Sequence, residues 1–294
     1  MGLRANPTYR QRRFGAEVRR LREQAGLTVS EAADVMGMRQ SHVSNVEAGR
    51  TPLAPERLRA LAQTTSGTRS TYLEALIAMG EARGKGWWST YRSAVRPSLL
   101  DLAELEAGAG RLLCYEPMFI PGLLQTREYA AAIHHEGYTR ETKRQRDLAV
   151  DFRLRRQQVL HGNGPPRTHL VVHEAALHVS LGRRSVMRDQ LIRLIEVSRL
   201  PHVTVQVLPF AGPVPFGTSF TVVEPEVEEL GTVVVSHVEN SLYLGDADAL
   251  ARYHATFARL SEVALPPVGA AALPEAHAVK DSLGIIQRLL YPLL

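Results

Sequence analysis

Cysteine and long apolar runs are what this 294-residue sequence lacks most clearly. Its one cysteine, Cys114, excludes an internal disulfide and a zinc site built from cysteines, and it suits a reducing cytosol. No apolar run reaches the roughly 18–20 residues that are needed to span a bilayer. The arginine-rich start has no apolar signal-peptide segment behind it. We therefore expect a cytoplasmic protein with no membrane segment.

Lysine is absent from residues 1–83, which hold 13 arginines against 8 acidic residues and so carry the whole net charge of +5. Residues 84–294 hold 22 basic and 22 acidic residues and are neutral. A basic segment favours a polyanion as its partner, because contacts with phosphates release counterions. Charge alone leaves DNA, RNA and an anionic membrane open.

The sequence signatures of common enzyme sites are missing too. There is no G-x-S-x-G elbow, no G-x-x-x-x-G-K-[ST] loop and no G-x-G-x-x-G turn. His173 and His178 are five residues apart, which puts their imidazoles on different faces of either a helix or a strand. We expect no enzyme, no metal and no cofactor, and we expect Cys114 to be a buried structural thiol.

Apolar residues in the N-terminal third recur at the spacing of five short helices. The expected inward positions are Phe14, Val18 and Leu21 in the first helix, Ala32, Ala33 and Met36 in the second, Val43 and Val46 in the third, Leu58, Leu61 and Ala62 in the fourth, and Tyr72, Leu73, Leu76 and Ile77 in the fifth. Thr28 and Glu31 form a capping box at the start of the second helix. Gly37 supplies the tight turn before the third helix, and Gly49 ends that helix.

The third helix, from about Arg39 to Glu47, keeps small polar residues on its outer face. These residues are Gln40, Ser41, Ser44 and Asn45. Two short helices that are joined through a glycine, the second with such a face, form a DNA-reading unit. Amide side chains pair with the N6/N7 edge of adenine, and hydroxyls adapt to several base edges. The alternatives fit less well, because membrane binding needs exposed bulky apolar residues, and a helical bundle for protein contacts does not explain the charge.

One string of residues resembles the Cro/CI-type helix-turn-helix, or XRE family. It runs Leu21-Arg22, Gly26-Leu27-Thr28, Ala33, Gly37, Gln40-Ser41, Val43-Ser44-Asn45-Val46-Glu47, Gly49-Arg50 and Pro52. The resemblance implies that Gln40, Ser41 and Asn45 reach bases. It implies that Arg39, Ser44 and Arg50 lie near phosphates of double-stranded DNA.

The same resemblance implies an architectural ion pair between Arg22 and Glu47, across the first and third helices. Two positions depart from the family. Val29 stands where the family often has a glutamine that contacts a phosphate, and Arg39 stands where a serine or threonine usually caps the third helix. Arg39 can substitute for the lost contact with its charge.

The rest of the chain alternates between helical and strand-like segments. A charged segment over 140–158 is expected to be helical, with Arg153, Arg155 and Arg156 on a solvated face rather than in a second nucleic-acid patch. Strands are expected at Leu170–His173, Ala176–Val179, Val203–Leu208, Ser219–Val223 and Thr232–His237, with Leu242–Leu244 extending the sheet. Helices are expected at Val186–Leu200 and from the cap Asp246 through Leu260.

This order predicts a multidomain protein, with an all-α helix-turn-helix domain followed by an α+β domain that has a small mixed sheet. The expected domains are 1–83, which binds DNA, 84–264, which serves regulation or dimerisation, and 265–294, a linker with a final helix. That helix carries Leu283, Ile286 and Leu290 on one face. It packs either on its own domain or on a neighbouring subunit.

Phe210 and Phe216 flank a Pro/Gly-rich loop after an expected strand. Two interpretations are open. The aromatic residues can form the mouth of a ligand pocket, or they can fold back from a rigid turn onto the core.

Two strings, Ile120–Ala130 and Val205–Phe210, resemble a group of actinobacterial regulators, the WhiJ-like proteins. The resemblance implies a transcription regulator, often paired with a small partner protein in an antitoxin-like arrangement. We expect a sequence-specific DNA-binding regulator that forms a homodimer, because useful specificity usually needs two half-sites. The C-terminal domain would dimerise or receive a signal. The alternative is an antitoxin-like interaction protein that binds a small partner protein and regulates its own operon.

Overall fold

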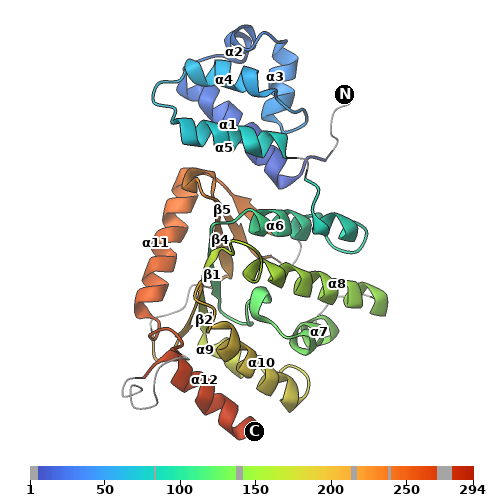
Figure 1. Cartoon of the computed structure of the whole chain (residues 1–294), viewed down its shortest axis with the longest axis vertical. Coiled ribbons are helices and arrows are strands. Elements are labelled where there is room, and N and C mark those ends of the chain that lie inside the picture. The colour runs from blue at the N-terminus through green and yellow to red at the C-terminus, as the bar shows by residue number, and fades with distance from the viewer. Residues whose placement is uncertain (1–5, 83, 137–141, 213–216, 238–239, 270–279) are drawn as a thin grey trace. The chain divides into compact units, whose positions relative to one another are not determined.

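The computed structural model describes residues 6–82, 84–136, 142–212, 217–237, 240–269 and 280–294. The chain divides into two compact units, which are coloured along the sequence in Figure 1. The N-terminal unit holds residues 1–89 and 227–230, and the C-terminal unit holds residues 90–226 and 231–294. No helix in the described ranges is long and apolar enough to cross a membrane.

The N-terminal unit has the helices that its sequence predicts. They are α1 (Tyr9–Gln24), α2 (Val29–Val35), α3 (Gln40–Glu47), α4 (Pro55–Gln63) and α5 (Ser70–Glu81). Capping boxes start α1 at Thr8 and α2 at Thr28, and Pro55 takes the first position of α4, where its missing N–H costs nothing. These local signals place the helix starts, and the all-α prediction is confirmed.

The core of this unit is one cluster in which every helix takes part. Val18, Val43, Val46, Leu61 and Leu76 are fully buried in it. Helices α1 and α3 touch so closely that a Cβ on Gly15 would lie 2.5 Å from the carbonyl oxygens of Val46 and Glu47. The core therefore holds α3 tightly by its inner side.

The elements that follow are mixed. In chain order they are η1 (Trp87–Tyr91), α6 (Pro97–Ala107), β1 (Arg111–Glu116), η2 (Gly122–Leu124), α7 (Arg127–Glu136), α8 (Lys143–Arg156), η3 (Gln157–Leu160), β2 (Arg167–His173), α9 (Glu174–His178), α10 (Arg184–Val197), β3 (Val203–Leu208), β4 (Phe220–Glu224), η4 (Glu228–Leu230), β5 (Thr232–Val235), β6 (Leu242–Leu244), α11 (Ala247–Val263), α12 (Ser282–Leu290) and η6 (Tyr291–Leu293).

The C-terminal unit is built on a six-stranded mixed sheet with the order β3-β2-β1-β4-β5-β6. Strands β1, β2 and β3 run parallel, with Cys114 opposite Leu170 and Leu170 opposite Val205. Strands β4, β5 and β6 join by antiparallel pairing, which begins between β1 and β4. The predicted fold class, a multidomain chain with a mixed sheet in its second part, is confirmed.

Helices cover both faces of this sheet, as Figure 1 shows, with α11 on one side and α6, α7, α8 and α10 on the other. Alternate residues of β1 enter separate cores. Leu112 and Cys114 face one core together with α7 and α10, whereas Leu113 and Tyr115 face the other with α11. Cys114 is buried, as expected for a structural thiol.

One strand prediction was wrong, and one strand was missed. Residues 176–179 lie mostly in the short helix α9, whose start is capped by His173, since its Nδ1 accepts a hydrogen bond from the N–H of Ala175 at 3.1 Å. The central strand β1 was not predicted at all. Its run Leu112–Tyr115 is apolar throughout because both faces of the strand are buried, so it shows no two-residue alternation.

The final helix α12 packs on its own unit, where Leu283 and Ile286 enter the core that α10 and β3 share. The segment before it closes the free edge of β3. Leu265 and Val268 donate backbone hydrogen bonds to Val207 and Val205, each at 2.9 Å. This edge of the sheet is therefore not open to another strand.

Candidate nucleic-acid interface

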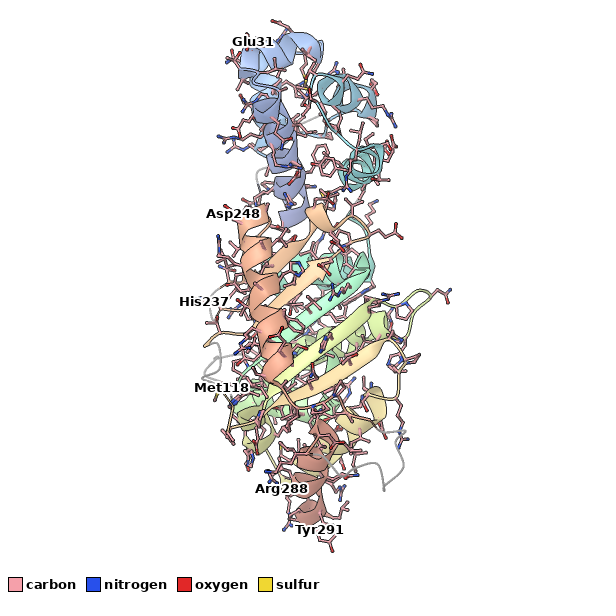
Figure 2. All side chains as sticks on the ribbon, turned by 90° about the vertical axis from the view of Figure 1, so that its left-hand side faces the viewer. Glu31, Met118, His237, Asp248, Arg288 and Tyr291 are labelled. Carbon is pink, nitrogen blue, oxygen red and sulfur yellow. The ribbon has the colours of Figure 1, made fainter. Side chains whose placement is uncertain are left out.

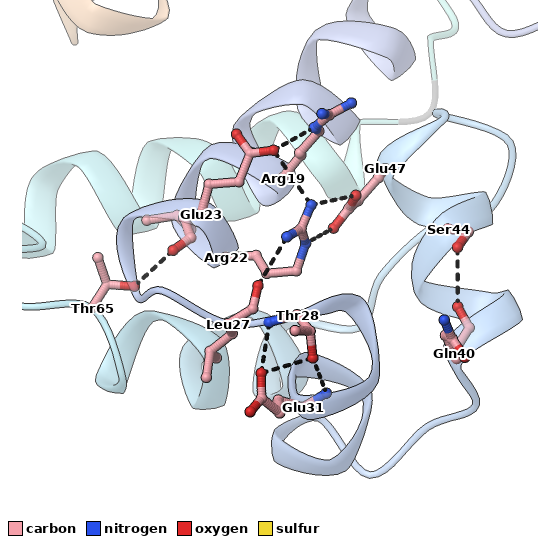
Figure 3. Close-up of polar contacts among 11 residues, drawn as sticks. Arg19, Arg22, Glu23, Leu27, Thr28, Glu31, Gln40, Ser44, Glu47 and Thr65 are labelled. Carbon is pink, nitrogen blue, oxygen red and sulfur yellow. Dashed lines mark hydrogen bonds and ion pairs between the residues drawn. The ribbon is translucent and has the colours of Figure 1, made fainter.

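Arg22 holds the helix-turn-helix together. Its guanidinium donates two hydrogen bonds to the carboxylate of Glu47, at 2.6 and 3.2 Å, and a third to the carbonyl oxygen of Leu27 at 2.9 Å (Figure 3). One side chain thus links α1, the turn before α2 and the end of α3. The hydrogen bond with Glu47 raises the pKa of Arg22 above its ordinary value. The pair that the family resemblance implies is present.

The turns on either side of α3 depend on glycine. Gly37 and Gly49 have φ angles of +58° and +72°, which L side chains rarely adopt. At Gly49 a Cβ would also lie 2.7 Å from the carbonyl oxygen of Gln11. These two glycines therefore fix the direction of the chain just before and just after α3.

The outer face of α3 is polar and accessible. Gln40, Ser41 and Ser44 are exposed, and Asn45 is half-buried. Two of these side chains bond within the helix, because Ser44 Oγ donates to the carbonyl of Gln40 at 3.3 Å and Asn45 Nδ2 donates to that of Ser41 at 2.8 Å. Both partners are carbonyls of the same helix, so these polar groups can turn to a ligand at little cost.

Cationic groups border this face. Arg39 is the N-cap residue of α3 and makes no side-chain capping bond. Arg50 follows the end of the helix, and both arginines are exposed. Val29 is the first residue of α2 and is half-buried. It offers no polar group where the family has a glutamine. The structure therefore brings all six predicted DNA-contacting residues onto α3 and its two ends.

Of the two aromatic residues that flank the Pro/Gly-rich loop, Phe216 lies outside the described residues. Phe210 itself is 58% exposed, and its ring meets His173 edge-on at 5.3 Å between ring centroids and His178 at 5.5 Å. It does not fold back onto the core. The described histidines, cysteine and acidic residues include no group of three that could hold a metal ion.

Sequence reasoning misplaced two arginines. Arg153 and Arg156 on α8 turn inward rather than lying on a solvated face, and only Arg155 of the three is exposed. Arg156 donates two hydrogen bonds to Glu106 on α6, at 2.6 and 2.8 Å, and the side chains of this pair are 10% and 5% exposed. Arginines at i and i+3 share a helix face, and that spacing was the available signal.

The fold and this surface define a helix-turn-helix protein with a second, mixed α/β unit. Residues 13–69 match a family model described as a helix-turn-helix domain, so the N-terminal unit belongs to a class that binds DNA. Residues 99–273 match the model of the domain of unknown function DUF5753, over more than half of the chain. The protein belongs to the DUF5753 family. No curated protein and no solved structure matches the chain.

Proposed function

We propose that this protein is a transcription regulator that reads the sequence of double-stranded DNA with α3 in the major groove. The observation that carries the proposal is the contrast between the two sides of α3. Val43 and Val46 are fully buried, whereas Gln40, Ser41 and Ser44 are exposed. The amide of Gln40 and the hydroxyl of Ser41, on a firmly held helix, suit the edges of base pairs.

Phosphate contacts are assigned to the ends of this helix. Arg39 and Arg50 are exposed there, and the charge surplus of +5 in residues 1–83 supplies the wider attraction. Contacts of this type set register and affinity without reading sequence. Ser44, which is exposed within α3 rather than at an end, is assigned a further, neutral phosphate contact.

A homodimer completes the proposal. One helix-turn-helix covers about one half-site, and two copies bind half-sites about 34 Å apart along the DNA. We assign the dimer contact, or the reception of a signal, to the C-terminal unit. Membership of the WhiJ-like group of actinobacterial regulators is part of this proposal and rests on the two strings at 120–130 and 205–210.

The test is a selection of bound sequences from random duplex DNA with the full-length protein, followed by affinity measurements on the enriched duplex and on a scrambled one. We expect two related half-sites about one helical turn apart, or a multiple of that spacing. Equal affinity for both duplexes would overturn sequence-specific reading. A small protein that co-purifies from the native host in a fixed ratio would favour the antitoxin-like alternative for the C-terminal unit.

A further inference from the structure

The topology of the C-terminal sheet singles out the carboxyl end of β1. From β1 the chain continues to β2 and β3 on one side, and it then returns to β4 on the other side of β1. In open α/β sheets, ligands bind outside the carboxyl ends of parallel strands, at the point where the strand order reverses. The last residue of β1 is Glu116, and it lies on the strand face that Leu112 and Cys114 share, toward the core that contains η2 and α7.

The segment that follows β1 is held rigidly by buried amides. Gln125 Nε2 donates to the carbonyl of Ile120 at 2.7 Å, and Gln157 Nε2 donates to the carbonyls of Gly122 and Gln125 at 3.0 and 2.7 Å. Gln190 from α10 donates to the carbonyl of Leu124 at 2.9 Å. A loop whose carbonyls are so fully satisfied does not have to order itself when a ligand arrives.

Two opposite charges beside this loop are left with spare bonding capacity. The guanidinium of Arg153 carries five N–H donors, yet its hydrogen bond within the described residues is the one from NH1 to Gln125 Oε1, at 2.8 Å. The carboxyl of Glu116 makes no hydrogen bond there and no ion pair within 4.0 Å. Both residues are half-buried. Their neighbour Arg156 is neutralised by Glu106.

The two groups are poorly solvated where they stand. Burial raises the pKa of Glu116 to about 7, and burial together with the neighbouring Arg156 lowers the pKa of Arg153 to about 10. The chain then continues into exposed apolar residues, Met118 at 53% and Phe119 at 41%, and Figure 2 labels Met118 at the margin of this unit. The donor Arg153 and the acceptor Glu116 thus lie close enough for each to feel the other's charge, and two exposed apolar residues follow Glu116 two and three positions along the chain.

We propose that the carboxyl end of β1 binds a small neutral molecule that carries an amide group on an apolar body. The amide oxygen accepts a hydrogen bond from Arg153, and the amide N–H donates to Glu116. The apolar body lies against Met118 and Phe119. Above pH 7, where the carboxyl of Glu116 is ionised, a neutral ligand is favoured because the charges of Arg153 and Glu116 balance, as do those of Arg156 and Glu106. In the proposed function, this molecule is the signal that the C-terminal unit receives. The binding itself does not rest on the proposed function; only its role in regulation does.

The experiment uses the full chain and hexanamide as the probe, with hexanoate and hexylamine as charged analogues of similar size, and measures binding by calorimetry and ligand-observed NMR. The site variants are Glu116→Met and Arg153→Met. Their matched controls are Glu128→Met and Arg155→Met, at exposed positions of α7 and α8. We expect the wild type and both controls to bind hexanamide in preference to the charged analogues, and each site variant to lose affinity by about tenfold to a hundredfold.

The melting temperature of each variant, measured without probe, distinguishes a loss of the binding site from a loss of the fold. Burial destabilises the carboxylate of Glu116 more than the charges of Arg153 and Arg156 stabilise it, so Glu116→Met should melt no lower than the wild type while it loses the probe. The proposal is overturned if hexanamide does not bind, if a charged analogue binds as well, or if the site variants keep their affinity. The proposed regulator function is tested separately, by the affinity for the selected duplex. The ligand proposal and the regulator proposal can therefore fail independently.

Discussion

Arg22 in α1 and Glu47 at the end of α3 share two hydrogen bonds, at 2.6 and 3.2 Å, in a pair whose side chains are only 10% and 11% exposed. A charge that loses its partner at such a site keeps the cost of its burial. Glu47→Ala should therefore lower the free energy of unfolding by about 3 kcal/mol. Urea denaturation of the full chain, followed by circular dichroism, measures this change.

The control for that prediction is Arg19→Ala. Arg19 pairs with Glu23 at 2.7 Å on the same helix, but the two side chains are 62% and 52% exposed. An exposed pair of this kind contributes little, so Arg19→Ala should leave the denaturation curve unchanged. Equal effects of both substitutions would show that Arg22 and Glu47 do not hold α3.

Gly15 sets the distance between α1 and α3. A Cβ at this position would lie 2.5 Å from two backbone carbonyl oxygens, which cannot move aside as a flexible side chain can. Gly15→Ala should lower the stability of the chain by about 1–3 kcal/mol and displace the reading helix, so affinity for DNA should fall with it. The control is Gly108→Ala, whose nearest neighbour would be an ordinary 3.9 Å away. Unchanged melting and DNA affinity in Gly15→Ala would contradict the close contact.

Base reading is assigned to Gln40 and Asn45. Each alanine substitution should cost about 1–3 kcal/mol at the selected duplex and much less at a scrambled one, because only base contacts discriminate. Fluorescence anisotropy with labelled duplexes measures both affinities. Gln63→Ala at the end of α4 is the control, since this glutamine is exposed but lies off α3. If Gln40→Ala and Asn45→Ala lower both affinities equally, these residues do not read bases.

The sequence alone predicted more of the N-terminal unit than of the C-terminal unit. Helix starts such as Thr28 with Glu31, and glycines such as Gly37, act over a few residues, so the N-terminal unit could be predicted in nearly every element. The central strand β1 depends on partners far along the chain, since Cys114 lies opposite Leu170 and Thr221. Without the position of β1, the sequence offered no reason to place Glu116 near an arginine of α8.

The stability of the chain should depend on pH through Glu116. Burial raises the pKa of its carboxyl to about 7 in the folded state, whereas the ordinary value is 4.5. The folded state therefore binds more protons between these values, and stability should fall as pH rises from about 4.5 to 7. The fall attributable to Glu116 is at most about 3–4 kcal/mol, because the pKa rises by about 2.5 units and one unit corresponds to about 1.4 kcal/mol.

Other groups titrate in the same range, so the measurement is the difference between the wild type and Glu116→Gln. Both are followed by thermal unfolding from pH 4 to 8. The variant should gain stability relative to the wild type as pH rises through 7, and its advantage should become constant only at about pH 8, where the folded-state carboxyl is almost fully ionised. A difference that does not vary with pH would show that the pKa of this carboxyl is not raised.

Two buried tyrosines should respond in opposite directions to loss of the hydroxyl. Tyr115 and Tyr129 are both fully buried. The Tyr115 hydroxyl has no hydrogen-bond partner among the residues that the structure describes, and burial raises its pKa to about 12. The Tyr129 hydroxyl instead accepts a hydrogen bond from the N–H of Ile120 at 3.2 Å. A buried polar group costs about 1–3 kcal/mol when it is left unsatisfied.

Tyr115→Phe removes such a group and should raise the free energy of unfolding by about 1 kcal/mol. Tyr129→Phe instead leaves the N–H of Ile120 without its acceptor and should lower it by about 1–2 kcal/mol. Because the two substitutions remove the same atom from equally buried rings, the sign of the difference reports hydrogen bonding alone. Thermal unfolding of both variants beside the wild type measures it. A loss of stability in Tyr115→Phe would mean that its hydroxyl has a partner in solution, such as a bound water molecule.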